Sequence, residues 1–174
     1  MSLSVEELNA LASDRASELL RACCGASRWV AAMVRRRPFF SRDAVLQAAD
    51  DEWSAMRESD WLEAFSHHPR IGETTAAAGG SATARGWSAS EQSAAATSGD
   101  DARIGLARLN RDYERRFGFI YIVSATGKSA GELLELARRR MDNDRDTELR
   151  TAAEEQRKIT RLRLEKLLDP VAAA

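Results

Sequence analysis

Apolar residues recur along most of the chain at the three- and four-residue intervals that place side chains on one face of an α-helix. Between residues 41 and 57, Ser41 can cap a helix on which Val45, Ala49, Trp53 and Met56 share a face. Between residues 100 and 117, a second stripe consists of Ile104, Leu106, Leu109, Tyr113 and Phe117. Similar patterns predict helices that begin at Ser4 and that cover 14–24, 27–37, 60–68, 88–97, 129–141 and about 146–168.

Residues that begin and end helices support these boundaries. Asp14, Ser27 and Asp60 are candidate caps, and Gly25, Pro38, Pro69 and Gly118 are candidate stops. The S-x-x-E pattern, which predicts a capping box at the start of a helix, occurs three times: Ser4 with Glu7, Ser88 with Glu91, and Ser129 with Glu132.

Two segments break the helical pattern. Residues 70–87 are rich in small residues and glycine, which predicts a long loop. Residues 119–125 are apolar and strand-like, but no second strand is available to pair with them, so we expect a buried extended segment. The sequence therefore predicts an all-α fold: a single compact domain over 1–174, with about seven or eight helices, one short extended apolar segment, no sheet and a C-terminal tail at 170–174.

Composition excludes several classes of protein. The 26 Lys and Arg residues are balanced by 27 Asp and Glu residues, which argues against nucleic-acid binding through bulk positive charge. The sequence lacks an apolar run of membrane-spanning length and a basic, signal-like N-terminus, so we expect no membrane association and a cytoplasmic location. The two cysteines, Cys23 and Cys24, are adjacent and cannot join distant segments; we interpret them as small residues on a helix.

Both histidines of the chain, His67 and His68, lie at a predicted helix end just before the long loop. Imidazole titrates near neutral pH and can move protons in either direction. Pro69 disfavours helical backbone angles at His68 and should hold that side chain at the helix end. A surface or capping pair is the structural alternative. A metal site is a weaker alternative, because adjacent side chains rarely converge on one ion.

Two further groups are candidates for chemistry. Ser88, Glu91 and Gln92 form one group at the second predicted capping box, where free N–H groups favour anions and a carboxylate can accept an N–H from a substrate. Arg163 shares a helical stripe with Ile159 and Leu167, whereas Arg161 points away from it. An internal salt bridge is the structural alternative for Arg163, and we interpret the arginine runs at 35–37 and 138–140 as solvated helix ends.

Taken together and in order, these motifs resemble 2-oxo-4-hydroxy-4-carboxy-5-ureidoimidazoline (OHCU) decarboxylases. The resemblance covers about residues 5–169 and rests on F-S-H-H-P-R-I-G-E at 65–73, W-S-x-x-E-Q at 87–92, F-G-F-I-Y-I-V at 117–123, N-D-R-D-T-E-L-R at 143–150 and I-T-R-L-R-L at 159–164. The loop between the first two motifs is rich in Ala and Gly, which departs from the family pattern. This departure concerns whether the loop closes over the substrate as a lid, rather than the chemistry.

The resemblance implies an all-helical, homodimeric enzyme that needs no cofactor or metal and forms (S)-allantoin during urate breakdown. It implies that His68, Glu91 and Arg163 are catalytic. It further implies that the substrate is bound by Pro69, Ser88 and Gln92 and by the backbone of Ile122, Val123 and Ser124.

A cofactor-free reaction is chemically reasonable, because the C5=N1 imine of OHCU can accept the electrons that decarboxylation releases. The protein then needs to position the substrate, place charge and deliver one proton. Three rival interpretations remain: a non-catalytic helical interaction module, a metal-assisted amidohydrolase at His67 and His68, and an RNA-binding helical domain. The absence of a spaced ligand set opposes the second, and the charge balance opposes the third.

Overall fold

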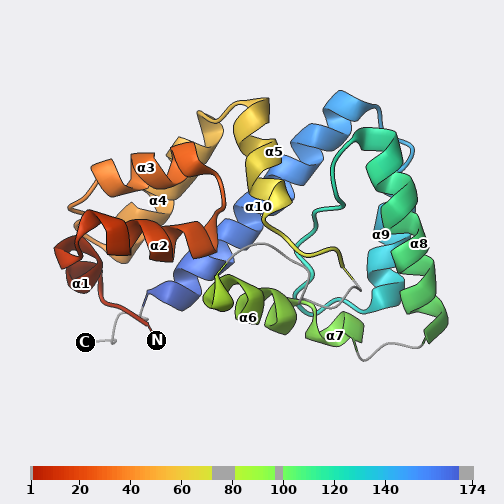
Figure 1. The fold of residues 1–174 in the computed structure, drawn as a ribbon, viewed down its shortest axis with the longest axis horizontal. Coiled ribbons are helices and arrows are strands. Elements are labelled where there is room, and N and C mark those ends of the chain that lie inside the picture. The colour runs from red at the N-terminus through yellow and green to blue at the C-terminus, as the bar shows by residue number, and fades with distance from the viewer. Residues whose placement is uncertain (1, 72–80, 97–99, 169–174) are drawn as a thin grey trace. The chain divides into compact units, whose positions relative to one another are not determined.

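The structure is a computed structural model that describes residues 2–71, 81–96 and 100–168. The described residues form ten helices and no sheet, which confirms the all-α prediction (Figure 1). Their contacts group the chain into two compact units, Met1–Ala64 with Arg157–Ala174, and Phe65–Gln156. The predicted tail at 170–174 and part of the predicted loop lie outside the described residues.

The first unit contains four complete helices: α1 (Val5–Ala10), α2 (Ser13–Cys23), α3 (Ser27–Arg35) and α4 (Arg42–Ser54). It also contains most of α5 (Glu58–Ser66) and the end of α10 (Arg145–Leu167). Helix α3 packs against both α2 and α4. The core is built on fully buried apolar side chains, and the indole N–H of one of them, Trp29, donates to the Ala49 carbonyl at 3.1 Å.

Side-chain caps begin two helices of this unit as predicted. Ser4 and Glu7 form a complete capping box on α1, and the Ser41 hydroxyl accepts from the Ala44 N–H on α4. Asp60, in contrast, lies inside α5 and accepts from the Arg57 N–H at 2.9 Å, so this helix begins earlier than the sequence suggested. Asp60 was predicted to precede the helix, but its carboxylate lies in the first turn and reaches back to an N–H at the start of the helix.

Helices α2 and α3 have no side-chain cap, so the candidate caps Asp14 and Ser27 were wrong. Asp14 lies in the first turn of α2, where the helix dipole favours its charge without a cap bond. Ser27 instead bonds Glu63 of α5, donating from its hydroxyl at 2.6 Å and from its N–H at 3.0 Å.

The two cysteines are buried and not joined in a disulfide. Cys23 is the last residue of α2 and Cys24 follows as its C-cap. Burial raises the pKa of the Cys24 thiol to about 12. Both are small core residues; Cys23 lies on a helix as predicted, whereas Cys24 follows the helix in an extended conformation.

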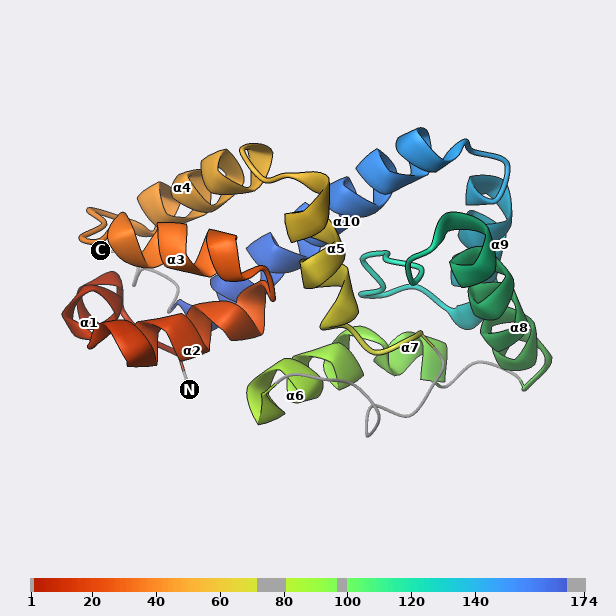
Figure 2. The same cartoon turned by 45° about the horizontal axis from the view of Figure 1, so that its top comes forward.

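The second unit contains α6 (Ala82–Glu91), α7 (Ser93–Ala96), α8 (Asp100–Phe117), α9 (Ala130–Arg140) and the first part of α10. Helices α8 and α9 lie side by side (Figures 1 and 2). Tyr113 of α8 lies at the centre of an aromatic cluster, with ring centroids 4.7 Å from Phe117, 5.9 Å from Phe119 and 5.2 Å from Tyr121.

Gly118 ends α8 with a φ of 81°, a left-handed conformation that favours glycine. Residues 119–125 then run extended and largely buried without joining a strand, as predicted. Ile104 was wrongly assigned to the buried stripe of α8, since it is 67% exposed. The stripe follows Leu106, Tyr113 and Phe117, and Ile104 lies two residues from Leu106, about 200° around the helix.

The prediction of a loop over 70–87 was partly wrong. Helix α6 already begins at Ala82, and the Ser81 hydroxyl caps it by accepting from the Ala84 N–H. The alanines and the one glycine of this stretch hid the helix because they give no apolar periodicity. Among the helices formed by the described residues, none combines the length and apolar character that a membrane crossing requires.

Candidate active site

The histidine segment follows α5 directly. Helix α5 ends at Ser66, and the His68 N–H donates to the Phe65 carbonyl at 3.1 Å to close one last turn. Pro69 is buried and both histidines are half-buried. As predicted, the residue before the proline has left the helix, which places the His68 imidazole at the helix end.

Two contacts with α8 hold the residues that follow His68. The Arg70 guanidinium pairs with both carboxylate oxygens of Glu114, at 2.9 and 2.8 Å. The buried Ile71 carbonyl accepts from the Asn110 side-chain amide at 2.7 Å. Asn110 and Glu114 are one turn apart, so a single face of α8 fixes the backbone on the C-terminal side of His68.

Ser88 and Glu91 do not begin a helix, and the predicted capping box at 88–91 was therefore wrong. Both residues lie in the C-terminal half of α6, whose start is capped by Ser81, and Gln92 is the C-cap. The S-x-x-E pattern is also compatible with two positions on one face of a continuing helix, and only the upstream cap separates the two cases.

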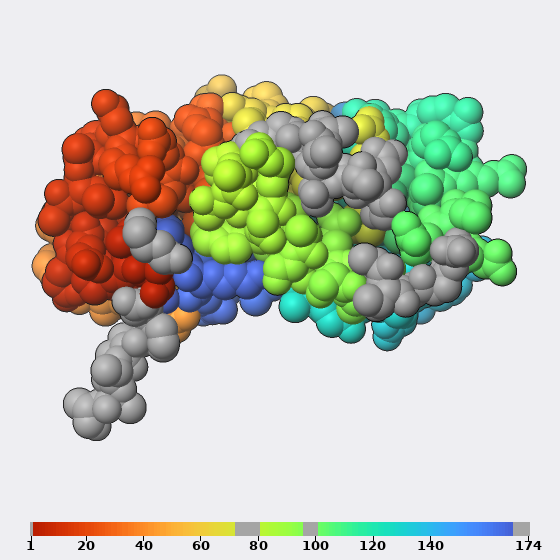
Figure 3. Space-filling view, turned by 60° about the horizontal axis from the view of Figure 1, so that its bottom comes forward, coloured from red at the N-terminus to blue at the C-terminus, as the bar shows by residue number. Residues whose placement is uncertain are grey.

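The position of Ser88 and Glu91 in α6 also changes their electrostatics. Ser88 is 4% exposed and Glu91 is 8% exposed, while the neighbouring Ala89 and Ser90 are exposed on a helix that reaches the surface (Figure 3). The C-terminal end of a helix carries a partial negative charge, so this position disfavours the anion binding that the sequence predicted. A buried carboxylate and hydroxyl at this end are acceptors suited to N–H donors.

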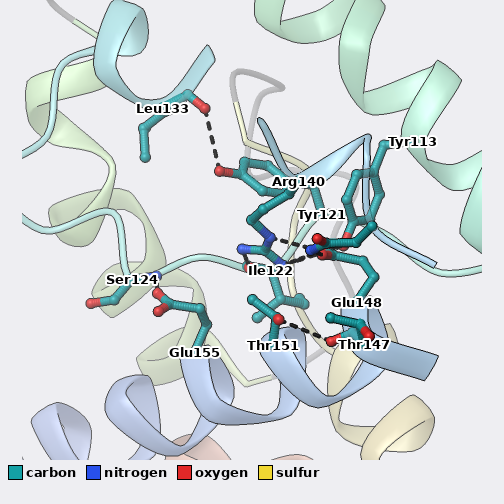
Figure 4. Close-up of polar contacts among 11 residues, drawn as sticks. Tyr113, Tyr121, Ile122, Ser124, Leu133, Arg140, Thr147, Glu148, Thr151 and Glu155 are labelled. Carbon is teal, nitrogen blue, oxygen red and sulfur yellow. Dashed lines mark hydrogen bonds and ion pairs between the residues drawn. The ribbon is translucent and has the colours of Figure 1, made fainter. Parts of the chain in front are cut away.

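Side chains from α9 and α10 hold the extended segment at two points (Figure 4). The Ile122 carbonyl accepts from the Arg140 guanidinium at 2.8 Å, and the Ser124 N–H donates to the Glu155 carboxylate at 2.8 Å. The Ser124 carbonyl accepts from the Lys128 ammonium at 2.7 Å. The backbone expected to contact a substrate is thus anchored on both sides of Val123.

Arg163 is buried in the first unit. It lies on α10 with 4% exposure, between the buried residues Ile159 and Leu167, and it donates to the Ala22 carbonyl at 3.3 Å. Arg161 is exposed and pairs with Asp50 at 3.4 Å. The predicted difference between the two arginines is confirmed.

The candidate residues divide between the two units. His68, Glu91 and the Ile122–Ser124 backbone belong to the second unit, and Arg163 belongs to the first. The convergence of all these groups around one substrate stays a prediction.

Two arginines that the sequence predicted to be solvated instead make specific contacts. Arg140 was expected to be solvated, but its side chain is 11% exposed and pairs with the fully buried Glu148. Arg37 donates to the Leu8 and Leu11 carbonyls at 2.9 and 2.7 Å. The N-D-R-D-T-E-L-R motif contains Glu148 and was the available signal for Arg140; no comparable signal marks Arg37.

Within the described residues, no three His, Cys, Asp or Glu side chains are grouped closely enough to hold a metal ion. His67 and His68 therefore have no such third ligand in the part of the chain that the structure describes.

Comparison with known proteins gives consistent matches. The family model for OHCU decarboxylase matches residues 9–165. The chain is 41% identical over 153 residues to the uric acid degradation bifunctional protein TTL of Arabidopsis thaliana, covering 87% of this chain but only 47% of that protein. It is 30% identical over 175 residues to a 2-oxo-4-hydroxy-4-carboxy-5-ureidoimidazoline decarboxylase of Halalkalicoccus jeotgali, covering 97% of this chain and 93% of that one.

Solved structures agree with these matches. A crystal structure of OHCU decarboxylase in the presence of (S)-allantoin superposes with a TM-score of 0.74 at 36% identity, covering 86% of this chain and 96% of that one. An (S)-allantoin synthase structure shares the fold, with a TM-score of 0.72 at 16% identity.

Proposed function

Because this chain belongs to the OHCU decarboxylase family, we propose that it converts OHCU to (S)-allantoin in urate degradation with His68 as the acid/base group. The observation that carries this assignment is the family match over residues 9–165, and the resemblance of the H-P-R-I-G segment at His68 and Pro69 supports it. The segment that bears His68 is held by Arg70 and Asn110, so its imidazole is attached to a fixed backbone.

The reaction can proceed without an external electron sink. The bond between C4 and the carboxylate breaks, and its electron pair forms a C4=C5 double bond while N1 takes up a proton. The resulting enol then gains a proton at C5 and loses the proton of its C4 hydroxyl, which leaves a C4 carbonyl. In the net reaction one proton replaces carbon dioxide.

In this scheme His68 accepts the C4 hydroxyl proton and delivers a proton to C5. A histidine suits this role because it both accepts and donates near neutral pH. Delivery from one fixed side of the ring produces a single stereoisomer. This requires the backbone that carries the imidazole to be fixed, and the contacts of Arg70 and Ile71 with α8 support this.

The remaining residues bind the substrate. Glu91, Ser88 and Gln92 accept from or donate to the ring and ureido groups, and Arg163 pairs with the carboxylate or a carbonyl. The buried state of Glu91 and Arg163 supports these roles, since charged side chains are rarely buried without a specific use. Pro69 and the backbone of Ile122, Val123 and Ser124 contact the ring.

The test is a pair of neighbouring variants. His68→Asn should lower kcat by roughly 10²–10⁴-fold, the range for loss of a general acid/base group. His67→Asn is the matched control, and its kcat should stay close to that of the wild type. Turnover is measured on enzymatically generated OHCU, with the chirality of allantoin followed by circular dichroism and folding checked by far-ultraviolet spectra.

A folded His68→Asn variant with near-normal turnover would remove His68 from the mechanism. The other candidate function, a non-catalytic helical interaction module, would be favoured if the wild type neither turned over OHCU nor changed its melting temperature with (S)-allantoin. Dependence of turnover on added zinc after chelation would favour the metal-assisted alternative.

A further inference from the structure

The buried ion pair of Arg140 and Glu148 contacts the Ile122–Ser124 backbone, the segment assigned to substrate binding. Arg140, the last residue of α9, donates from Nε to the Glu148 carboxylate of α10 at 2.7 Å. Its Nη1 donates to the Ile122 carbonyl at 2.8 Å. One planar guanidinium therefore joins α9, α10 and the extended segment (Figure 4).

Glu148 is fully buried, and its carboxylate has three partners. Arg140 and the Tyr113 hydroxyl donate to one oxygen, and the Asn143 amide donates to the other at 2.8 Å. Burial raises the pKa of the Tyr113 hydroxyl above its usual range, despite the nearby Arg140 guanidinium, so this group stays protonated and acts as the donor. These donors fix the position of the Glu148 carboxylate, and the carboxylate in turn orients the Arg140 guanidinium.

Aromatic packing restrains the same guanidinium. Its central carbon lies 4.8 Å from the centroid of the Tyr121 ring, and the Tyr121 hydroxyl donates to the Leu133 carbonyl of α9 at 3.3 Å. A guanidinium that is both paired and stacked cannot move without breaking several contacts. The N–H that it directs at Ile122 therefore has a defined position.

The opposite end of the tripeptide is held independently. Glu155 of α10 accepts from the Ser124 N–H, and Lys128 donates to the Ser124 carbonyl. Within the described part of the chain, neither the N–H nor the C=O of Val123 forms a hydrogen bond. The two anchors therefore lie on either side of a residue whose own N–H and C=O are not used by the described part of the fold.

We propose that Arg140, oriented by Glu148, is a positioning residue that fixes the Ile122–Ser124 backbone for substrate binding. This inference rests on the proposed function and deepens it. It also assigns a role to part of the N-D-R-D-T-E-L-R motif, because Glu148 of this motif accepts from the guanidinium and Asn143 donates to Glu148. Arg140 itself is not a catalytic residue, since it acts through the main chain.

Two variants separate the ion pair from the contact with Ile122. Arg140→Lys keeps the positive charge beside Glu148 but lacks the planar fork that reaches two acceptors at once. The double variant Arg140→Met with Glu148→Gln removes both charges, so neither remains buried alone, and the glutamine still offers an acceptor to Tyr113 and a polar group to Asn143. Arg139→Lys is the matched control at the adjacent, exposed position.

Both test variants should raise KM by about tenfold and weaken (S)-allantoin binding in calorimetry to a similar extent, the effect of about one hydrogen bond. The value of kcat should stay within about threefold, because a backbone contact made equally in the ground and transition states affects binding alone. Hydrogen exchange at the Val123 amide of the ligand-free protein should become faster. The control should show none of these changes.

The proposal is overturned if folded variants keep the wild-type KM and allantoin affinity, even when they melt at lower temperature. A fall in kcat with unchanged KM would also overturn it, since the pair would then act on the chemical step. Failure of the proposed function looks different: the wild type itself would then neither bind allantoin nor turn over OHCU, and the positioning role would be refuted with it.

Discussion

The amide of Asn110 determines how firmly the His68 segment is attached to α8. Its nitrogen donates to the Ile71 carbonyl at 2.7 Å, and both residues are 4% exposed. The other side-chain atom, Oδ1, is buried and has no hydrogen-bond partner among the described residues. Substitution at this position therefore tests a single donated hydrogen bond.

The expected cost of Asn110→Ala follows from these two atoms. Truncation leaves the buried Ile71 carbonyl without a donor, which costs about 1–3 kcal/mol. It also removes the unsatisfied Oδ1, which offsets part of that loss, so the net effect should lie near 1 kcal/mol. For a chain of this length this corresponds to a melting temperature lower by roughly 2–4 °C.

Asn110→Asp provides a sharper test because its effect depends on pH. An ionised aspartate cannot donate to Ile71 and would be a buried, unpaired charge, which costs about 3–5 kcal/mol. Glu114, one turn away, adds a like charge, although Arg70 pairs with it. A protonated aspartate can donate to the Ile71 carbonyl and restore the bond.

The sign of the pH dependence follows from burial. Burial raises the pKa of the introduced aspartate in the folded variant above its unfolded value near 3.9, so the associated stability is complete below about pH 4 and is lost as the pH rises through the raised native pKa. The gap in melting temperature between wild type and Asn110→Asp should therefore be smaller at pH 5 than at pH 8, where it should reach roughly 6–20 °C.

Thermal melts followed by circular dichroism at both pH values measure this gap. Arg111→Ala, at the next and exposed position of α8, controls for general effects on the helix. An equal gap at pH 5 and pH 8 would refute the proposed contact between the Asn110 amide and the Ile71 carbonyl. The kcat of Asn110→Ala should also fall, since the segment that carries His68 loses one of its two anchors.

Two further predictions concern acid stability and assembly. The N–H and hydroxyl of Thr147 both donate to Asp144 and hold the pKa of that carboxyl below its usual value. The stabilising effect of Asp144 is therefore present above about pH 4 and is lost as the pH falls through the lowered native pKa. The melting-temperature gap between wild type and Asp144→Asn should thus shrink from pH 6 to pH 3, while the control Asp142→Asn should show no gap at either pH. The family resemblance predicts a homodimer, so light scattering coupled to size exclusion should give twice the chain mass of 19.2 kDa, and a monomer at micromolar concentration would contradict this prediction.

The helices could be predicted where their start signals act locally. The capping boxes of Ser4 with Glu7 and Ser129 with Glu132 are confirmed, because all of their hydrogen bonds lie within four consecutive residues. Ser88 and Glu91 have the same spacing, yet α6 had already begun at Ala82. A local pattern cannot distinguish the start of a helix from its interior when alanine and glycine conceal the preceding turn.

The site was less accessible to sequence reasoning than the fold. The stripe of Ile159, Arg163 and Leu167 correctly predicted a buried arginine, because helical periodicity reports burial directly. The burial of Arg140 could not be predicted in this way. Its partners Glu148 and Ile122 lie on other elements, and only the turn between α9 and α10 and the path of the extended segment bring them together.

The buried thiol of Cys24 gives this protein an internal probe of unfolding. With its pKa raised to about 12, this thiol is almost wholly protonated at pH 7, whereas an unfolded cysteine, with a pKa near 8.5, carries a few per cent of the reactive thiolate. Alkylating reagents should therefore modify this side chain essentially only when the chain opens. The rate of alkylation would report the opening equilibrium of the native protein without any introduced label.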